Sequence, residues 1–243
     1  MITRGQVKFI NSLKYKKNRD KYDLFMVEGH KIVVELLDSD FEIYNVFATE
    51  QWVLNNNIKF KNIHIVKLID LKKISNLDST PNVIAIVRKN VRETDFSLSN
   101  VNVALFDIQD PGNLGTIIRT CDWFGVRNII CSKNTVDKYN SKVIQSSMGS
   151  IFRVNVIYLN LFEYLKNLSE DIMVYCTTVS GGAKIEYIKD SSRKLIVFGN
   201  ESRGLPEEIL NMKLLNLSIE KKGSAESLNV ATACGIILNN FCN

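Results

Sequence analysis

The stretch VNVALFDIQDPGNLGTIIRTCDWFGV, residues 101–126, joins an apolar run to a second patterned run through a Pro-Gly turn. The apolar run at its start is typical of a buried strand. After the turn, Ile117, Ile118 and Trp123 recur at helical spacing, which predicts a helix over residues 113–124 with these side chains facing the core. A strand that turns directly into a helix is the repeating unit of an α/β sheet.

The alternation of strands and helices continues on the C-terminal side of this stretch. We expect strands at residues 101–108, 128–131, 152–157, 172–177, 195–198 and 215–219. We expect helices at residues 139–148, 161–168 and 206–212, and a last one from Ser227 to Phe241. Strands that alternate with helices predict a mainly parallel sheet covered on both faces.

A smaller α/β unit is expected on the N-terminal side. Its predicted helices cover residues 6–13 and 31–37, and its predicted strands cover residues 24–27, 41–48, 63–66 and 83–87. Residues 89–100 are polar and contain two serines near their end, as linkers commonly do. The chain is therefore predicted to have two domains, residues 1–98 and residues 99–243.

Composition limits the class of protein. The 243 residues are 45% hydrophobic and 23% charged, which is typical of a globular chain. We expect no membrane segment and no secretory signal, because no apolar run reaches the length either would need. The only histidines, His30 and His64, lie far in sequence from any cysteine, so no metal site is expected. Five scattered cysteines predict buried thiols in a reducing cytoplasm: Cys121, Cys131, Cys176, Cys234 and Cys242.

The positive charge of the chain is concentrated at its start. Residues 1–31 hold eight basic and three acidic side chains, and this excess of five equals the net charge of the whole chain. A basic cluster at one end suits contact with nucleic-acid phosphates. A solvated helix face rich in lysine explains the same charge equally well.

Three blocks of the C-terminal half combine a predicted strand end, a glycine-bearing turn and polar side chains. They are DPGNLGTIIRTCDWFG (110–125), LIVFGNESRGLP (195–206) and LSIEKKGSAESLNVATACG (217–235). Ligands of open α/β sheets bind beyond the carboxyl ends of the strands, where such turns lie. Together the blocks predict one composite site for a ligand other than a metal.

Each block also has a purely structural interpretation. Asn113 is a suitable N-cap, and Arg119 can bind a phosphate or simply lie on the surface. Gly199 allows close approach of a flat ligand, and Glu201 can bind a hydroxyl or a cation, but neither dinucleotide nor phosphate-loop motifs occur. Free N–H groups near Ser227 can bind a polar ligand, while Ser227 and Asn229 are equally typical helix caps.

The segments NLGTIIRT (113–120), GNESRGL (199–205) and SLNVA (227–231) resemble, in order and spacing, the three motifs of SpoU/TrmH-type RNA ribose methyltransferases of the SPOUT superfamily. The resemblance covers residues 101–243. KYKKNR (14–19) followed by FMVEG (25–29) is similar to the substrate-binding domain of the ribosomal-RNA members. The implied fold is a C-terminal α/β trefoil knot with a small ribosomal-protein-like α/β domain before it.

The resemblance also implies a homodimer, S-adenosylmethionine as cofactor and RNA as partner. Implied cofactor-binding positions are Phe198, Gly199, Asn200, Gly204, Ile219, Ser227 and Leu228. Implied catalytic positions are Arg119, Asn113, Glu201, Ser227 and Asn229. Implied RNA-binding positions are Lys14, Lys16, Lys17, Arg19, Lys21 and Glu28. Arg119 is expected to hold the phosphate and the developing alkoxide, since an arginine with a pKa above ~12 is a poor base.

The expected reaction is methyl transfer from S-adenosylmethionine to a ribose 2'-hydroxyl of structured RNA, above all 23S ribosomal RNA. The N-terminal domain favours this substrate over transfer RNA. The alternatives are a transfer-RNA ribose methyltransferase and a catalytically inactive RNA-binding protein of the same fold. A third hypothesis is a nucleotide-binding regulator, which the absence of dinucleotide and phosphate-loop motifs disfavours.

Overall fold

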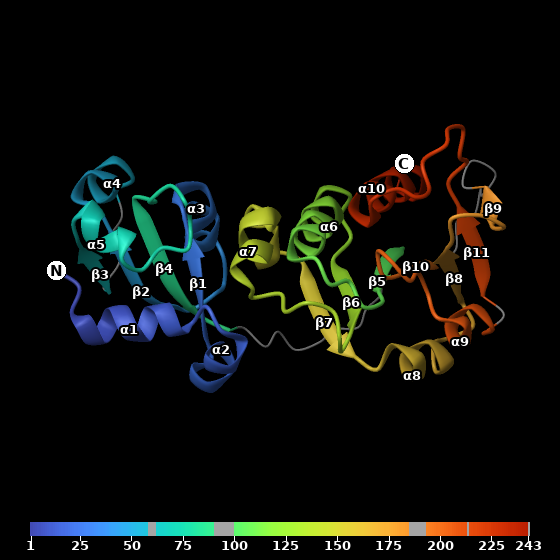
Figure 1. The fold of residues 1–243 in the computed structure, drawn as a ribbon, viewed down its shortest axis with the longest axis horizontal. Coiled ribbons are helices and arrows are strands. Elements are labelled where there is room, and N and C mark those ends of the chain that lie inside the picture. Colours follow the sequence, from blue (N-terminus) through green and yellow to red (C-terminus); the bar gives the residue numbers. More distant parts are fainter. Residues whose placement is uncertain (58–61, 90–99, 185–192, 213, 243) are drawn as a thin grey trace.

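The computed structural model describes residues 1–57, 62–89, 100–184, 193–212 and 214–242. Its helices and strands form two units that follow each other along the long axis of the molecule (Figure 1). Nearly all of the predicted linker lies outside the described residues, so the boundary between residues 98 and 99 stays a prediction. In the described part of the chain, every helix is too short or too polar to cross a membrane.

The N-terminal unit is a mixed four-stranded sheet with helices on both sides. Its strands, in the order β1-β4-β2-β3, are β1 (Leu24–Glu28), β4 (Val83–Arg88), β2 (Ile43–Ala48) and β3 (Ile63–Ile65). Strand β4 pairs antiparallel with β1 and β2, and β2 pairs parallel with β3. Its helices are α1 (Arg4–Ser12), α2 (Lys16–Tyr22), α3 (His30–Leu37), α4 (Glu50–Asn55) and α5 (Leu68–Lys72).

The C-terminal unit is a seven-stranded sheet in which all the described pairings are parallel, as the sequence predicts. Its strands, in the order β7-β6-β5-β10-β8-β11-β9, are β7 (Asn155–Leu159), β6 (Asn128–Ser132), β5 (Val101–Leu105), β10 (Arg193–Phe198), β8 (Ile172–Thr177), β11 (Leu215–Ser218) and β9 (Ala183–Lys184). Its helices are α6 (Pro111–Trp123), α7 (Ser141–Ser147), α8 (Leu161–Lys166), α9 (Glu207–Leu210) and α10 (Val230–Phe241), with one 3-10 turn, η1 (Ser150–Phe152).

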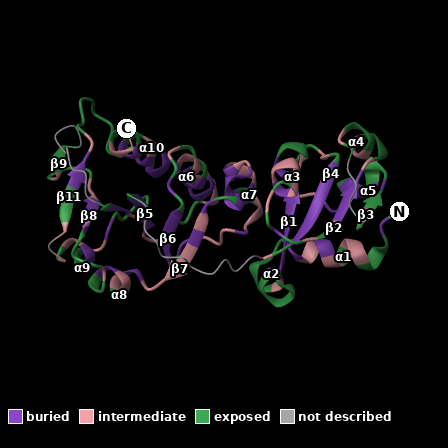
Figure 2. Cartoon of the chain, turned by 180° about the vertical axis from the view of Figure 1, so that it is seen from behind, coloured by how far each residue is buried: buried purple, intermediate pink, exposed green. Residues whose placement is uncertain are grey.

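Helices cover both faces of the parallel sheet, which confirms the predicted α/β class. Alternate residues of β5 point to opposite faces: Val103 packs in the cluster of α6, α7 and α10, and Ala104 packs in the cluster of α8 and α9. The central strands are buried along their whole length, and the exposed residues gather at the outer helices and loops (Figure 2). The trefoil knot stays a prediction.

Four predictions about local structure were wrong. Helix α6 is capped by Asp110, whose side chain accepts the Asn113 N–H at 2.9 Å, and it begins at Pro111, where proline has no backbone N–H to leave unsatisfied. Trp123 is 85% exposed instead of facing the core, although Ile117 and Ile118 are buried as predicted. The last helix begins at Val230 instead of Ser227, and β7 begins three residues later than expected because η1 precedes it.

A buried ion pair joins the two units. The guanidinium of Arg19 is almost fully buried, donates to the Asp137 carboxylate from Nε and Nη2 at 3.1 and 2.6 Å, and donates from Nη1 to the carbonyls of Leu13 and Lys14. Next to it, the rings of Phe25 and Tyr139 pack with their centroids 4.4 Å apart. Arg19 therefore holds the units together and is not an exposed RNA contact, which corrects the sequence-based assignment.

We expect Asp137→Ala to lower the free energy of unfolding by about 3–5 kcal/mol, because it leaves the Arg19 charge buried without its partner. Urea unfolding measures the change. Lys16→Ala is the control, since the Lys16–Asp20 pair is exposed at 64% and 45% and is expected to contribute only about 0.5 kcal/mol. Equal losses in the two variants would contradict the structural role of Arg19.

Candidate active site

A tight turn follows β10 and forms the base of the candidate site. Gly199 and Gly204 lie back to back: a Cβ on Gly199 would stand 2.4 Å from the Gly204 carbonyl carbon and 2.6 Å from the Leu205 nitrogen. The backbones of Asn200 and Gly204 exchange hydrogen bonds of 3.0 and 2.9 Å, and Gly204 adopts the left-handed φ of 67°. This turn requires glycine at both positions.

The side chain of Asn200 fastens this turn to the neighbouring strand end. Its Nδ2 donates to the Asp107 carbonyl at 2.7 Å, and its Oδ1 accepts the N–H groups of Ser202 and Arg203, each at 3.0 Å. Both the nitrogen and the oxygen of the Asn200 side-chain amide therefore have hydrogen-bond partners. It holds the turn beside the loop that leads from β5 into α6, so the first and second sequence blocks are in contact.

Glu201 extends from the turn over the start of α6. Its Oε1 accepts the Asn113 Nδ2 at 2.9 Å, and weaker contacts of 3.4 and 3.5 Å come from the backbone N–H groups of Asp110 and Gln109. A carboxylate suits this place because the first turn of a helix presents free N–H groups and a partial positive charge. These hydrogen bonds hold the Glu201 carboxylate over the first turn of α6.

Asn113 connects the second block to the third. Its Oδ1 accepts the Asn229 Nδ2 at 2.9 Å, while the Asn229 Oδ1 caps α10 by accepting the N–H groups of Ala231 and Thr232 at 2.9 and 3.3 Å. Because Asp110 caps α6, the Asn113 side chain is free to make these contacts. The hydrogen bond from the Asn113 N–H also lowers the pKa of Asp110, helped by the nearby Lys142. One chain, Glu201–Asn113–Asn229, thus joins all three blocks.

The loop before α10 completes the rim of this site. Ser227 lies in an exposed run from residue 220 to 229, Leu228 is 49% exposed, and Ile219 is half-buried against the core. Phe198, in contrast, is 1% exposed, and its carbonyl accepts the Phe106 N–H at 2.8 Å. Its buried side chain packs beneath the turn, and its assignment as a cofactor contact stays a prediction.

Arg119 does not contact this chain of side chains within one protomer. It lies six residues beyond Asn113, which is about 9 Å along the helix and about 240° around it. Its side chain is exposed, and its guanidinium has no hydrogen-bond or ion-pair partner among the described residues. It faces instead a cleft between the two units.

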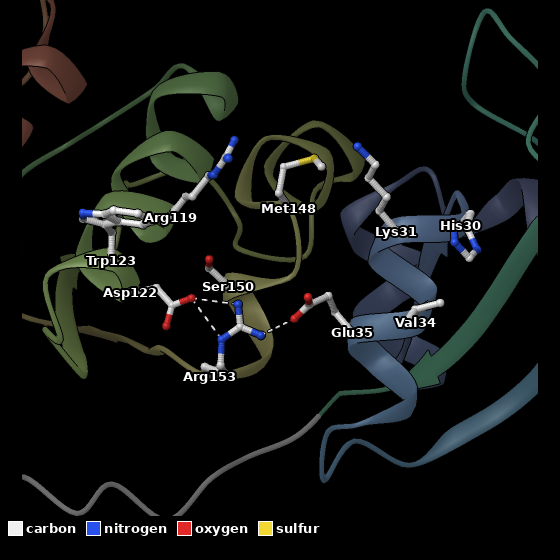
Figure 3. A pocket seen from close by; sticks show the side chains of 10 residues that line it. All are labelled: His30, Lys31, Val34, Glu35, Arg119, Asp122, Trp123, Met148, Ser150 and Arg153. Atoms are coloured by element: carbon white, nitrogen blue, oxygen red, sulfur yellow. Dashed lines mark hydrogen bonds and ion pairs between the residues drawn. The ribbon is translucent and has the colours of Figure 1, made fainter. Parts of the chain in front are cut away.

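This inter-unit cleft lies between α3 on one side and α6 and η1 on the other (Figure 3). Its volume is about 520 Å³. It is lined by His30, Lys31, Val34, Glu35, Arg119, Asp122, Trp123, Met148, Ser150 and Arg153. The sequence alone did not reveal this cleft, because its walls come from segments more than 80 positions apart. The one local signal was the spacing that puts Trp123 one turn beyond Arg119 on α6.

Of the five remaining RNA-binding candidates, the four lysines are all exposed: Lys14, Lys16, Lys17 and Lys21. Three of them lie on α2, a helix that sequence periodicity missed because it is almost entirely polar. Glu28, the last candidate, is 2% exposed, and its carboxylate accepts hydrogen bonds from Ser75 Oγ at 2.6 Å and from the Asn76 N–H at 3.0 Å. Glu28 therefore fastens a loop of the N-terminal unit and does not contact RNA.

The cysteines are free thiols, as expected from their spacing. Four are buried and Cys242 is half-buried. Burial raises the pKa of Cys176 to about 11, and it raises the pKa of Cys131 further. Such thiols stay protonated and act as small apolar side chains. Among the described residues, no group of three or more His, Cys, Asp or Glu side chains has the arrangement of a metal site.

Comparison with known proteins gives matches over both units. Residues 100–239 match the SpoU rRNA Methylase family, and residues 4–85 match the MRM3-like substrate binding domain. The chain is 31% identical over 234 residues to the 23S rRNA (guanosine(2553)-2'-O)-methyltransferase of Bacillus subtilis, and the match covers 96% of this chain and 94% of that protein.

Solved structures resemble the whole chain as well. A putative RNA methyltransferase of the TrmH family from Porphyromonas gingivalis superposes with a TM-score of 0.88 at 29% identity, covering 99% of this chain and 98% of that one. An AdoMet-bound rRNA methyltransferase from Sinorhizobium meliloti superposes with a TM-score of 0.87 at 29% identity, covering 99% and 95%.

Proposed function

This chain belongs to the SpoU rRNA methylase family, and on that premise we propose that it methylates a ribose 2'-hydroxyl of 23S ribosomal RNA with S-adenosylmethionine as methyl donor. The observation that carries the proposal is the hydrogen-bonded chain Glu201–Asn113–Asn229, which assembles all three motif blocks at one end of the parallel sheet. The match of residues 4–85 to a substrate-binding domain supports ribosomal RNA as the substrate.

S-adenosylmethionine is the cofactor, and the residues at the turn after β10 fit it. The paired glycines keep the turn narrow, so that backbone groups lie at its surface, and Leu228, in the loop before α10, has an exposed apolar side chain. We assign binding to Gly199, Asn200, Gly204, Ile219, Ser227 and Leu228. When bound, the cofactor supplies a methyl group already activated by the positive sulfonium.

The residues of the chain then have distinct tasks. Glu201, Asn113 and Asn229 fix the floor of the site and orient the ribose. Arg119 holds a phosphate next to the reactive hydroxyl through a two-pronged hydrogen bond and stabilises the alkoxide that develops as the hydroxyl attacks. Alignment of the oxygen with the methyl group about 3 Å away contributes much of the rate enhancement. The exposed lysines of α2 supply sequence-independent phosphate contacts.

A homodimer completes this site. Because Arg119 faces away from the Glu201–Asn113–Asn229 chain in its own protomer, we infer that it serves the turn of the partner. Helix α10 offers a suitable contact face, because its apolar Ile236 is 40% exposed. Sedimentation is expected to give twice the 27.7 kDa chain mass. We place the enzyme in the cytoplasm, with the ribosomal RNA.

Incubation with labelled S-adenosylmethionine and an RNA fragment tests the reaction. The first fragment to use contains the 23S position equivalent to guanosine 2553, the target in the name of the Bacillus relative. The expected product carries one methyl group on a ribose, detected as a phosphodiester that resists alkali. The same fragment with a 2'-deoxy target is the control. Methylation of the deoxy control, or no transfer to any 23S fragment, would contradict the proposal.

A further inference from the structure

The inter-unit cleft carries two positive side chains without a direct ion-pair partner among the described residues. Lys31 extends from α3 of the N-terminal unit, and Arg119 extends from α6 of the C-terminal unit (Figure 3). Both are exposed, and neither has a hydrogen-bond or ion-pair partner among the described residues. In Figure 3 they project from the two walls toward the same open side, with Met148 between them.

The other charged groups of the cleft, one arginine and two carboxylates, pair with each other. Arg153 donates to Asp122 from Nε and Nη2 at 3.0 and 2.8 Å, and its Nη1 pairs with Glu35 of α3. The contact with Asp122, helped by Glu35, raises the pKa of Arg153. Because Arg153 holds both carboxylates, neither makes an ion pair with Lys31 or Arg119, and the three cations and two anions of the cleft leave it a net charge of +1.

The spacing of the two walls is fixed by packing. Gly149 has a φ of 95°, and a Cβ there would lie 2.7 Å from the Cγ of Glu35, so α3 rests directly on the backbone before η1. The Arg153 ion pairs hold the same two elements together. The opening between Lys31 and Arg119 is thus bordered by elements that are in direct contact.

An exposed aromatic ring lies at the edge of the same cleft. Trp123 is 85% exposed and follows Arg119 by one helical turn. Stacking on an aromatic side chain and contact with a cation are the two means by which proteins bind single RNA strands. Two facing cations with an aromatic ring beside one of them match a nucleotide chain better than an acidic peptide, which has no base to stack.

We propose that the inter-unit cleft binds the RNA strand next to the methylated nucleotide, with Lys31 on a phosphate opposite Arg119 and Trp123 stacked on a base. The inference rests on the proposed function and extends it, because it makes the N-terminal unit a direct contact of the reacting strand. Lys31 is then a substrate-binding residue that places this strand along α6.

The lysine contact is tested by Lys31→Ala, with Lys72→Ala as the matched control. Lys72 is an exposed lysine of the same unit, at the end of α5, far from the cleft (Figure 1). Affinity for the guanosine-2553 fragment is measured over a range of salt concentrations. We expect Lys31→Ala to weaken binding about tenfold and to lower the salt dependence by about one released counterion, while Lys72→Ala changes neither.

Kinetics separate this inference from the proposed function. Lys31→Ala is expected to raise KM for RNA about tenfold while kcat and S-adenosylmethionine affinity stay within twofold of the wild type. Lys31→Met, which keeps the aliphatic stem but not the charge, is expected to show the same changes in KM and kcat as Lys31→Ala. If Lys31→Ala and Lys72→Ala bind RNA equally well, the cleft is not the strand site, whatever the wild type does. If the wild type transfers no methyl group to RNA, the proposed function itself fails.

The aromatic contact is tested by Trp123→Ala and Trp123→Phe. We expect the alanine variant to bind RNA about tenfold more weakly and the phenylalanine variant to retain most of the affinity, since any aromatic ring stacks on a base. Sedimentation of both variants is expected to match the wild type. A change of mass in Trp123→Ala would assign the indole to the protomer interface, and unchanged RNA affinity would likewise overturn the stacking contact.

Discussion

Arg119→Ala is expected to lower kcat at least about 1,000-fold while S-adenosylmethionine binds as in the wild type. Arg119 is the one motif residue in the described structure with a charged, unpartnered side chain on α6, and the proposed reaction needs a cation where the alkoxide develops. The cofactor turn lies on other elements, so its affinity is not expected to change. Single-turnover methyl transfer and calorimetric titration with the cofactor measure the two effects.

Two further variants sharpen this prediction. Arg119→Lys keeps the charge but loses the flat fork of donors, so we expect it to stay about 100-fold below the wild type. Arg127→Ala is the control, because Arg127 is an exposed arginine just beyond α6 and makes no side-chain contact that the structure describes. A fully active Arg119→Ala protein would remove Arg119 from the reaction. The Glu201–Asn113–Asn229 chain would then need another partner.

The α/β architecture could be predicted because the apolar runs and helical spacings that indicate it each lie within a short stretch of sequence. Apolar runs such as 101–105 and 128–132 are buried along their whole length, and helix α6 follows β5 closely. The three motif blocks were also recognisable, because each is continuous in sequence. What local patterns could not reveal was that Asp110 takes the role of cap and leaves Asn113 to join Glu201 and Asn229.

The sequence-based predictions failed for charged residues that are buried and for an aromatic residue that is exposed. Arg19 lies in a basic, polar segment and Glu28 at the end of an apolar strand, and their partners are 118 and 47 positions away, so the sequence near them does not show what would pair their charges. Trp123 has the helical spacing of a core residue, but periodicity assumes that every apolar side chain on one face is covered. The cleft between Lys31 and Arg119 depends on the packing of the two units, and the spacing of Arg119 and Trp123 is its one local signal in the sequence.

Gly199→Ala is expected to weaken S-adenosylmethionine binding at least about 100-fold and to abolish methyl transfer. The added Cβ would lie 2.4 Å from the Gly204 carbonyl carbon and 2.6 Å from the Leu205 nitrogen. Both atoms are backbone, so they move only if the Asn200–Gly204 hydrogen bonds break. Overpacking of this kind costs about 1–3 kcal/mol of stability, which most folded domains tolerate. Calorimetric titration with the cofactor, beside a thermal unfolding curve, measures both effects.

Two variants separate the loss of the turn from a general loss of folding. Gly5→Ala has open space around the new Cβ and lies in α1, so it should raise stability by about 0.5–1 kcal/mol and leave cofactor affinity unchanged. Asn200→Ala keeps both glycines but removes the bonds to Asp107, Ser202 and Arg203, so its cofactor affinity should fall between those of Gly199→Ala and the wild type. A folded Gly199→Ala protein that binds the cofactor normally would show that the turn after β10 does not hold it, because no smaller movement accommodates that Cβ.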